Sequence, residues 1–479
     1  MADHLTLPVP GASPAKPQLE VTAPFDGSLI ATLETAGPEA VEQALTTAYR
    51  LYRNRDAWLP AHERIAILEQ AARLMSERAE QLAREAAREG GKPLLDSRVE
   101  VARAIDGVRN CIECMRTDAG KEIPMGVNPA SVNRLAMTHR EPIGVVVAVS
   151  AFNHPLNLIV HQVGPAIAAG CPVIVKPAED TPLSCYRFVE ILREAGLPES
   201  WCQALVVDEL ATAERLVTDP RVGFFSFIGS AHVGWMLRSK LAPGTRCALE
   251  HGGAAPVIVE ADADLDDVLP LLAKGGFYHA GQVCVSVQRV FCHSDIAAQV
   301  ADRLAELGQA MVVGDPTRAE TEVGPLIRPR ETERVHEWVS EAVAQGAILI
   351  SGGKKLSETC YLPTVLLNPP AEARVSRQEI FGPVICVYSY EDMDEAIERA
   401  NSLPFSFQAA VCTGSLDRAL RAYRRLDAAA VMVNDHTAFR VDWMPFAGLK
   451  QSGLGVGGIP YTFKDMQISK LLVIRSSEL

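Results

Sequence analysis

The sequence predicts an α/β fold with two lobes. Three observations lead to this prediction: the chain has 479 residues, short strands alternate with helices from residue 143 onward, and a second alternating series begins after residue 250. A chain of this length is several times the size of a typical domain, so more than one hydrophobic core is expected. Repeated strand–helix–strand units predict parallel, doubly wound sheets of the dinucleotide-binding kind.

Two helices are expected before the alternation starts. The segment 60–88 carries apolar residues at helical spacing and is followed by "EGGKP", where glycine would end a helix. A second helix is expected over 96–115. The first alternating series follows, with strands over 144–150, 172–178, 202–208 and 222–230 and helices over 154–170, 184–198, 211–219 and 231–242.

The second series has the same character. Strands are expected over 255–260, 286–295, 347–353, 383–390, 407–414 and 429–435, and helices over 297–310, 332–346, 393–402 and 415–427. In such folds, ligands bind at strand ends and in the crevice between lobes. Two pieces fit neither lobe, namely 131–144 and the tail 466–479. Both are predicted to be extended strands, paired either between subunits or back on their own lobe.

Composition excludes several classes of protein. Hydrophobic residues make up 48% and charged residues 22% of the chain, which is close to the average of soluble globular proteins. The net charge is −13 and no long basic cluster is present, so nucleic acid is not expected as a partner. Eleven scattered cysteines are unlike a secreted disulfide framework, and no export signal is visible. A cytoplasmic location is therefore expected.

One uncharged stretch is long enough to be mistaken for a membrane span. Residues 143–175 contain no Asp, Glu, Lys or Arg. Polar residues such as Asn153, His161 and Gln162 interrupt the stretch, and proline and glycine punctuate it. We therefore expect a strand, a helix and a strand buried in a parallel sheet, with no membrane contact.

Glycine and lysine motifs in the first series indicate ligand sites without deciding them. Gly229 and Gly234 lie at a strand-to-helix junction, where free N–H groups favour a phosphate, although such turns also use glycine for geometry. Lys176 ends a strand, with Glu179 three residues on. This pair could hydrogen-bond a ribose or form an ordinary surface ion pair.

The cysteines differ in their surroundings. Cys111 and Cys114 form a C-x2-C, but no second Cys or His pair follows at metal-ligand spacing, so no metal site is expected. Most of the others lie within apolar strands and helices, where cysteine packs as a small hydrophobic residue. Cys284 follows "HAGQV" on a turn into the second lobe, and this pattern fits a nucleophile and a buried packing residue equally well.

Seven phrases, taken in order, indicate a family. The phrases "AFNHP", "VIVKPAEDTP", "FIGSAHVG", "LEHGG", "GQVC", "EIFGPV" and "MPFAGLKQSGLG" have the order and spacing found in aldehyde dehydrogenases. The chain thus resembles the aldehyde dehydrogenase superfamily from about Val21 to its C-terminus. The domains that this resemblance implies are a Rossmann-like cofactor domain over 21–130 and 145–252, an α/β catalytic domain over 253–461, and a small β bridging element for oligomerisation over 131–144 and 462–479. Residues 1–20 are expected to precede them as a mobile or surface-draped arm.

The resemblance also implies roles for individual residues. Cys284 matches the nucleophile, Glu250 the general base and Asn153 the oxyanion-binding amide. For NAD, with NADP as the alternative, the matching contacts are Lys176 and Glu179 at the adenosine ribose, Gly229 and Ser230 at the pyrophosphate, and Glu379 and Phe381 around the nicotinamide and its ribose. The implied partners are a small aldehyde and further copies of the chain, as a homodimer or homotetramer.

Aldehyde oxidation needs these residue types. An aldehyde gives up hydride only after a nucleophile has made a tetrahedral adduct, and a thiolate both attacks and leaves well. A free cysteine has a pKa of roughly 8.5, so Cys284 needs nearby positive charge, for which Lys176 and NAD+ are the candidates. The Asn153 side chain and the Cys284 backbone N–H would hold the oxyanion. Glu250 would then activate the water that releases a carboxylic acid.

Two positions bear on the details. The family usually reads Glu-Leu-Gly-Gly before a basic residue, whereas this chain has "EHGGAAP", so His251 could alter the orientation or proton affinity of Glu250. Glu179 would repel a 2'-phosphate, which favours NAD over NADP. Retention of Glu250 favours hydrolysis, and a coenzyme A-acylating semialdehyde dehydrogenase and a non-catalytic homologue are the alternatives.

The substrate pocket is predicted from one helix and one loop. If a helix begins near Asn153, the residues that lie along one face and match the family's substrate tunnel are His154, Leu158 and His161. Val283 and Val285 would narrow the tunnel beside the sulfur, and the loop residues Arg440, Trp443 and Phe446 would close its mouth. The polar lining predicts a small aldehyde with an anionic or hydroxylated tail, although structural histidines and a solvated arginine fit the same pattern.

Overall fold

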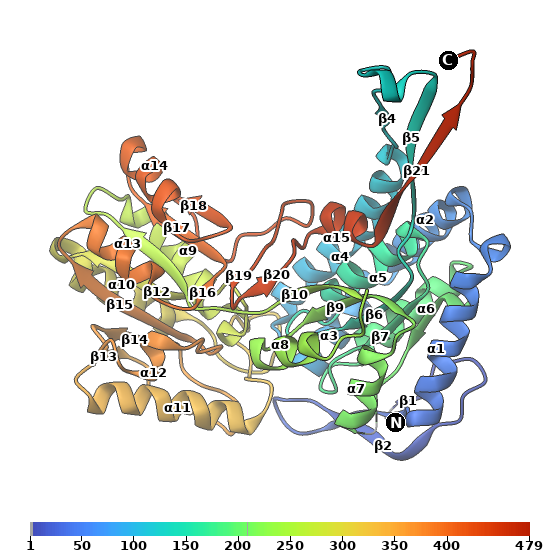
Figure 1. Ribbon diagram of the computed structural model, residues 1–479. Coiled ribbons are helices and arrows are strands. Elements are labelled where there is room, and N and C mark those ends of the chain that lie inside the picture. Colours follow the sequence, from blue (N-terminus) through green and yellow to red (C-terminus); the bar gives the residue numbers. More distant parts are fainter. Residues whose placement is uncertain (1–2, 208) are drawn as a thin grey trace.

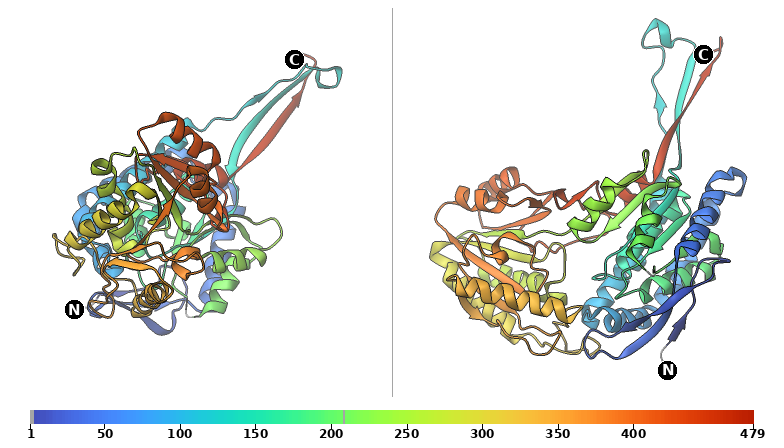
Figure 2. Two further views of the ribbon diagram at one scale, coloured as in Figure 1. Left: turned by 90° about the vertical axis from the view of Figure 1, so that its left-hand side faces the viewer. Right: turned by 60° about the horizontal axis from the view of Figure 1, so that its bottom comes forward.

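The computed structural model describes residues 3–207 and 209–479, which form two α/β lobes and an arm that projects from the first lobe (Figure 1). Two further views show that the arm stands clear of both lobes (Figure 2). Residues 1 and 2, which begin the N-terminal segment expected over residues 1–20, lie outside the described residues. So does Asp208, at the end of the strand predicted over 202–208. The prediction of an α/β fold with parallel sheets is confirmed.

A six-stranded sheet forms the centre of the first lobe, in the order β20-β10-β9-β6-β7-β8. Its strands are parallel except for β20, which runs antiparallel to β10. Apolar side chains dominate both faces because each face packs into a core of its own. The strands are β6 (Val145–Val149), β7 (Val173–Lys176), β8 (Cys202–Ala204), β9 (Val222–Ile228), β10 (Arg246–Glu250) and β20 (Gly453–Leu454).

The helices of this lobe cover the sheet. They are α1 (Pro38–Arg53), α2 (Ala61–Glu77), α3 (Ala79–Gly90), α4 (Leu94–Thr117), α5 (Asn157–Ala169), α6 (Leu183–Glu194), α7 (Leu210–Thr218), α8 (Ala231–Ser239) and α15 (Ile459–Asp465). The single helix predicted over 60–88 is wrong, because the chain bends at Arg78 between α2 and α3. Neither glycine nor proline lies at this bend, so the residue pattern does not reveal it. The guanidinium of Arg78 binds Glu194 of α6 at 2.7 Å, across the lobe.

The uncharged segment 143–175 folds as predicted into β6, α5 and β7. Every residue of α5 is buried, and Gly170 ends the helix with a φ of +85°. Among the described residues there is no helix with the length and apolar character needed to cross a membrane.

The second lobe contains a seven-stranded sheet in the order β13-β14-β15-β12-β11-β17-β18, parallel except for β13. Its strands are β11 (Ala255–Val259), β12 (Val287–His293), β13 (Ile348–Ser351), β14 (Thr364–Leu367), β15 (Val384–Tyr390), β17 (Gln408–Cys412) and β18 (Ala430–Val433). Its helices are α9 (Leu265–Phe277), α10 (Ser294–Ala310), α11 (Pro329–Ala344), α12 (Arg374–Arg377), α13 (Met393–Asn401) and α14 (Leu416–Arg425). The sequence-based description missed α9, which contains Pro270, and the short strand β14, which lies between β13 and β15.

The chain returns to the first lobe before its end. After β19 (Leu449–Lys450) has paired with β16 (Phe405–Ser406), β20 joins the first sheet, and α15 places Ile459 and Phe463 in the first core. The catalytic domain predicted over 253–461 therefore differs from the structure near its C-terminal boundary. Apolar side chains at 459 and 463 need a core, and the nearest one lies beside α4 and α5.

The N-terminal segment is paired rather than mobile. The strands β1 (Asp3–Leu5), β2 (Ala15–Thr22) and β3 (Leu29–Thr35) form a small sheet in the order β1-β3-β2. Leu5, Leu7 and Val9 are buried, so this segment is held on the first lobe by apolar contacts as well as by strand pairing. The segment from Asp3 onward is therefore packed on the first lobe.

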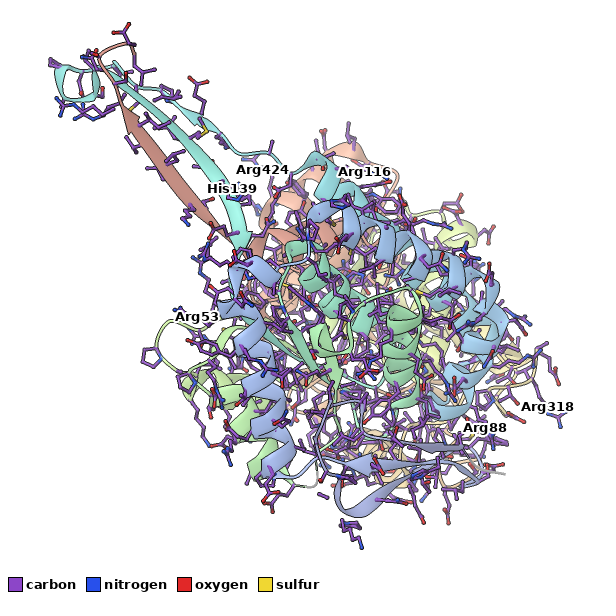
Figure 3. The ribbon with its side chains drawn as sticks, turned by 90° about the vertical axis from the view of Figure 1, so that its right-hand side faces the viewer. Arg53, Arg88, Arg116, His139, Arg318 and Arg424 are labelled. Atoms are coloured by element: carbon purple, nitrogen blue, oxygen red, sulfur yellow. The ribbon has the colours of Figure 1, made fainter. Side chains whose placement is uncertain are left out.

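The two pieces that fitted neither lobe pair with each other. The tail strand β21 (Gln467–Arg475) lies antiparallel to β5 (Arg134–Pro142), and β4 (Glu122–Ile123) pairs on the other side of β5. Figure 3 shows the resulting arm from the side, with His139 of β5 on it. Four consecutive apolar side chains of β21 are exposed, namely Leu471, Leu472, Val473 and Ile474.

Candidate active site

A cavity of about 670 Å³ lies between the two lobes. It is found at the carboxyl ends of strands of the first sheet, where doubly wound folds bind ligands. The predicted residues that line it are Asn153, His154, Leu158, Lys176, Glu179, Gly229, Ser230, Glu250, Val283, Cys284, Val285, Glu379, Phe381, Arg440 and Phe446. Two predicted residues, His161 and Trp443, do not line it.

A tight turn brings Cys284 into the cavity. The 3-10 helix η4 (Tyr278–Gly281) follows α9, and φ is +50° at His279, +53° at Ala280 and +68° at Gly281. A Cβ at Gly281 would lie 2.1 Å from the carbonyl oxygen of Gly382, so only glycine fits there. The glycine of "HAGQVC" is therefore required by the approach of the backbone at 382.

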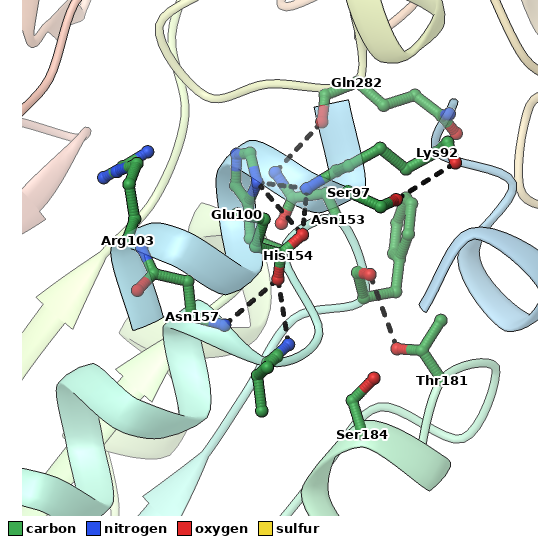
Figure 4. A network of polar contacts seen from close by, with 12 residues as sticks. Lys92, Ser97, Glu100, Arg103, Asn153, His154, Asn157, Thr181, Ser184 and Gln282 are labelled. Carbon is green, nitrogen blue, oxygen red and sulfur yellow. Dashed lines mark hydrogen bonds and ion pairs between the residues drawn. The ribbon is translucent and has the colours of Figure 1, made fainter. Parts of the chain in front are cut away.

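Gln282 fastens the nucleophile loop to both lobes (Figure 4). Its carbonyl oxygen accepts a hydrogen bond of 2.9 Å from Nδ2 of Asn153 in the first lobe. Its side-chain oxygen accepts a hydrogen bond of 2.9 Å from the backbone N–H of Ile327 in the second lobe. Because the amide nitrogen of Asn153 carries two hydrogens, one remains to donate to an oxyanion.

The electrostatics around the thiol differ from the sequence-based expectation. Burial raises the pKa of Cys284 to about 12, the positive charge of Arg440 opposes this, and Glu379 and Glu250 add to it. Arg440, rather than Lys176, is thus the cation that favours the thiolate. The ammonium of Lys176 instead donates to Glu179 at 3.2 Å.

Arg440 is held with part of its hydrogen-bonding capacity unused. Its guanidinium carbon lies 3.5 Å from the ring centroid of Phe446, and its Nη2 lies 3.3 Å from Nδ1 of His161. Its Nε is buried without a partner in the described part of the chain. Burial lowers the pKa of Arg440, and the negative charge of Glu250 opposes that shift.

Glu250 ends β10 and lies inside the cavity, with its Oε1 against Gly457, where a Cβ would be 2.0 Å away. Burial raises the pKa of Glu250, and Arg440 opposes this. The neighbouring His251 does not act on Glu250 as we expected. Its Nδ1 lies 2.8 Å from the carbonyl oxygen of Gly229, and its ring packs between Phe227 and Trp235.

The cofactor end of the cavity has the features of a phosphate site. Gly229 and Ser230 precede α8, and the Ser230 side chain does not cap the helix, so its first backbone N–H groups are free of a side-chain partner. The Gly229 N–H is bound by the carbonyl oxygen of Glu250 at 3.0 Å. The carbonyl oxygen of Gly229 thus contacts the His251 ring, and the N–H of Gly229 donates to the Glu250 carbonyl oxygen. These two contacts fix the position of the turn.

Glu379 and Phe381 lie on the second-lobe side of this region. Burial raises the pKa of Glu379 to about 8, and its Oε1 accepts a hydrogen bond of 3.1 Å from the N–H of Gly253. Phe381 has a φ of +48° and packs edge-on to Phe152, with ring centroids 5.9 Å apart. Both side chains face the same space as Gly229 and Cys284.

The comparisons with known proteins agree on one family. The model of the aldehyde dehydrogenase family matches residues 11–472. The chain belongs to this family. The 3-sulfolactaldehyde dehydrogenase of Priestia aryabhattai is 38% identical over 457 residues, which is 95% of either chain.

Solved structures give the same result. The crystal structure of aldehyde dehydrogenase 21 from Physcomitrella patens, in complex with the reaction product succinate, is 33% identical with a TM-score of 0.95 and covers 100% of this chain and 99% of that one. The glyceraldehyde-3-phosphate dehydrogenase of Methanocaldococcus jannaschii, complexed with NADP, is 32% identical with a TM-score of 0.91 and covers 96% and 100%. The chain therefore has the fold of the aldehyde dehydrogenase family over nearly its whole length.

The substrate end of this aldehyde dehydrogenase departs from prediction in three places. Helix α5 begins at Asn157 and not near Asn153, so His154 lies on the preceding turn. His161 is buried beneath the cavity, where its Nε2 lies 2.7 Å from Asp442. Trp443 is 54% exposed and lies outside the cavity.

Sequence reasoning missed four arginines that line the cavity, namely Arg103, Arg328, Arg330 and Arg334. Arg103 on α4 lines the cavity, and its guanidinium donates two hydrogen bonds to Asp442, at 2.7 and 3.1 Å. Its position on an amphipathic helix gave no signal, because an arginine there is usually solvated. Among the described residues no group of three or more His, Cys, Asp and Glu side chains could hold a metal ion.

Proposed function

We propose that the enzyme oxidises a small aldehyde with an anionic or hydroxylated tail to a carboxylic acid, through a thiohemiacetal and a thioester on Cys284. The observation that carries this proposal is the position of Arg440, whose charge acts on both the Cys284 thiol and the Glu250 carboxyl inside one cavity. Arg440 can favour the thiolate of Cys284 in the first half of the reaction and the carboxylate of Glu250 in the second. This arrangement fits a reaction that needs a thiolate first and an activated water later.

In the first half of the reaction, Sγ of Cys284 forms a bond to the aldehyde carbon. The oxygen becomes negatively charged, and the free N–H of the Asn153 amide would donate to it, which in comparable sites contributes on the order of 3 kcal/mol. Gly229, Ser230, Glu379 and Phe381 would hold NAD(P)+ in the cavity, where the cofactor would supply the hydride acceptor and additional positive charge. The product of this half is a thioester on Cys284.

In the second half, Glu250 takes a proton from the water that attacks the thioester. Its raised pKa suits a general base that works near neutral pH. The C–S bond then breaks, the acid leaves and the thiol is restored. The rival reaction, transfer of the acyl group to coenzyme A, would not need Glu250 in this position.

The anionic tail of the substrate is inferred from Arg440 and Arg103. Both line the cavity, and the buried Nε of Arg440 lacks a partner that an anion would supply. Arg103 is paired with Asp442, and the other cations of the lining, Lys176, Arg328, Arg330 and Arg334, also have carboxylate partners. Among the described residues of the lining, Arg440 is therefore the cation without an ion pair. The names of the similar proteins support this reading, since sulfolactaldehyde, succinate and glyceraldehyde 3-phosphate all carry an anionic group.

Cofactor choice, assembly and compartment are further parts of the proposal. Glu179 lies in the cavity, 42% exposed and paired with Lys176, and its carboxylate would repel a 2'-phosphate, so we propose NAD over NADP.

The exposed apolar strand β21 supports a homodimer or homotetramer. All eleven cysteines are free, which supports a cytoplasmic location.

The test is a panel of small aldehydes, each assayed with NAD and with NADP. Oxidation is measured by the absorbance of NADH or NADPH, and formation of the free acid is measured without coenzyme A. Wild type should form free acid, and Cys284→Ala should not. Acid formation that depends on coenzyme A would favour the acylating alternative. Arg440→Ala should raise KM for anionic aldehydes and lower kcat for all of them, whereas equal KM changes for neutral and anionic aldehydes would contradict the anionic tail.

A further inference from the structure

A lysine lies inside the protein beside the cavity. Lys92 is 1% exposed and follows Gly91, which ends α3 in a left-handed conformation. Its Nζ contacts the carboxylate of Glu100 and Nδ1 of His154 (Figure 4). These three residues, named here the Lys92 cluster, form a buried chain of polar contacts that reaches the cavity at His154.

The cluster fixes the tautomer of His154. The ammonium of Lys92 has three N–H donors and no acceptor, so Nδ1 of His154 must accept a hydrogen bond and carry no proton. Burial and the charge of Lys92 lower the pKa of His154 to about 4, so the ring is neutral near pH 7. The single ring proton is therefore on Nε2.

Glu100 keeps this arrangement in place. Burial alone would raise its pKa, but the charge of Lys92 lowers the pKa well below the usual range. The second carboxylate oxygen accepts hydrogen bonds of 2.9 and 3.0 Å from the backbone N–H groups of Leu156 and Asn157. Lys92, pinned by an ionised Glu100, thus has no freedom to turn away from His154.

The Nε2–H of His154 is available to a ligand. The His154 side chain is 17% exposed and lines the cavity, and within the described residues Nε2 has no hydrogen-bond partner. The two neighbouring histidines differ from it. His161 uses its Nε2 on Asp442, and both ring nitrogens of His279 are buried and do not line the cavity.

We propose that His154, held by Lys92 as an Nε2–H donor, hydrogen-bonds a hydroxyl oxygen on the carbon chain of the substrate, so that hydroxylated aldehydes are preferred over their deoxy analogues. This inference rests on the proposed aldehyde oxidation and names the substrate class of the same site. A neutral donor suits a neutral oxygen, whereas an anionic group is matched by Arg440. The Nε2–H of His154 would distinguish a hydroxylated aldehyde from its deoxy analogue, because the analogue leaves this partly desolvated donor without a hydrogen-bond partner.

The kinetic test uses two matched pairs of aldehydes with the full-length enzyme: lactaldehyde with propanal, and glyceraldehyde 3-phosphate with 3-oxopropyl phosphate. In wild type, we expect kcat/KM to be about tenfold to a hundredfold higher for the hydroxylated member of a pair. His154→Leu should reduce this preference to less than about threefold, and His154→Gln, which keeps an N–H donor, should retain part of it. His62→Leu, at an exposed position of α2, is the matched control and should leave the preference unchanged.

A second variant tests the lysine itself. Lys92→Met/Glu100→Gln removes both charges together, so the fold is not left with one unpaired buried ion. We expect His154 to sample both tautomers in this variant, and the ratio of kcat/KM for lactaldehyde to kcat/KM for propanal to fall severalfold. Nitrogen-15 NMR of histidine-labelled enzyme, with the His154 signals assigned from His154→Leu, should show the Nε2–H tautomer in wild type and a mixture in the double variant.

The outcomes separate this inference from the function on which it rests. Wild-type oxidation of both members of a pair at equal kcat/KM, or an Nδ1–H tautomer at His154, overturns the role of His154 and leaves aldehyde oxidation intact. An enzyme that oxidises none of the four aldehydes overturns the proposed function and this inference with it.

Discussion

Two buried glutamates, Glu89 and Glu100, each accept hydrogen bonds from backbone N–H groups at the N-terminus of a helix, yet their protonation differs. Glu89 of α3 accepts hydrogen bonds from the backbone N–H groups of Leu183 and Ser184, at 2.8 and 2.9 Å, where α6 begins. Glu100 of α4 does the same at Leu156 and Asn157, where α5 begins. Burial raises the pKa of Glu89 to about 8, whereas the pKa of Glu100 is lowered.

The two pKa values differ because the remaining partner of each carboxyl, besides the backbone N–H groups, is different. Glu89 has the hydroxyl of Ser184 as its remaining partner, which is a neutral donor. Glu100 has the ammonium of Lys92. Two backbone donors are thus too few to keep a fully buried carboxyl ionised, and an adjacent cation is what decides its charge. The charged member, Glu100, contacts His154 of the cavity lining, whereas Glu89 contacts α6.

Removal of the cation should have the largest effect on this comparison. Lys92→Met leaves Glu100 buried without its counter-ion, so we expect a loss of about 3–5 kcal/mol in the free energy of unfolding, measured by urea denaturation at pH 7. Lys92→Met/Glu100→Gln should recover most of that loss. If single and double variants are equally destabilised, packing of the lysine stem rather than its charge accounts for the effect.

The protonation of Glu89 should appear in the pH dependence of stability. Its pKa is raised from 4.5 to about 8 in the folded state, so its contribution is complete below about pH 4.5 and is lost as the pH rises toward 8. The slope is at most about 1.4 kcal/mol per pH unit. Glu89→Gln should remove this slope, and the difference between wild-type and variant stability curves from pH 5 to 8 measures it. A difference that is constant over this range would mean that Glu89 is ionised throughout.

A smaller effect is expected from the hydroxyl beside Glu89. Ser184→Ala removes the Oγ–H donor and should cost about 1 kcal/mol, because the carboxyl keeps its two backbone partners. The cost should be larger at pH 9 than at pH 5, since an ionised carboxyl depends more on its donors. Thermal denaturation at the two pH values provides the measurement, and an equal cost at both would argue against titration of Glu89.

The smallest effect is expected next to Lys92. Ser97→Ala removes a hydrogen bond of 3.2 Å to the carbonyl oxygen of Lys92 and leaves the ion pair intact, so about 0.5 kcal/mol should be lost without pH dependence. This variant serves as the matched control for Ser184→Ala, since both replace one buried serine. A cost as large as that of Lys92→Met would show that backbone position, and not charge, governs the Lys92 cluster.

The sequence predicted the site better at its centre than at its edges. Cys284, Glu250 and Asn153 lie within recognisable phrases, and the structure brings all three to one cavity. His161 and Trp443 were placed by an assumed helix start and an assumed loop direction, and both lie elsewhere. Arg103 was missed because nothing in its neighbourhood distinguishes a cavity-facing arginine from a solvated one.

The sequence by itself determined the alternation of strands and helices, the two lobes and the family, because hydrophobic period and turn residues act over short distances along the chain. Only the tertiary structure decided which groups meet across long distances. It placed Arg440 rather than Lys176 beside the thiol, turned His251 toward Gly229, and buried Lys92 against Glu100 and His154. Charge and tautomer at a buried site depend on the groups that surround it in space, and residues far apart in sequence supply those groups.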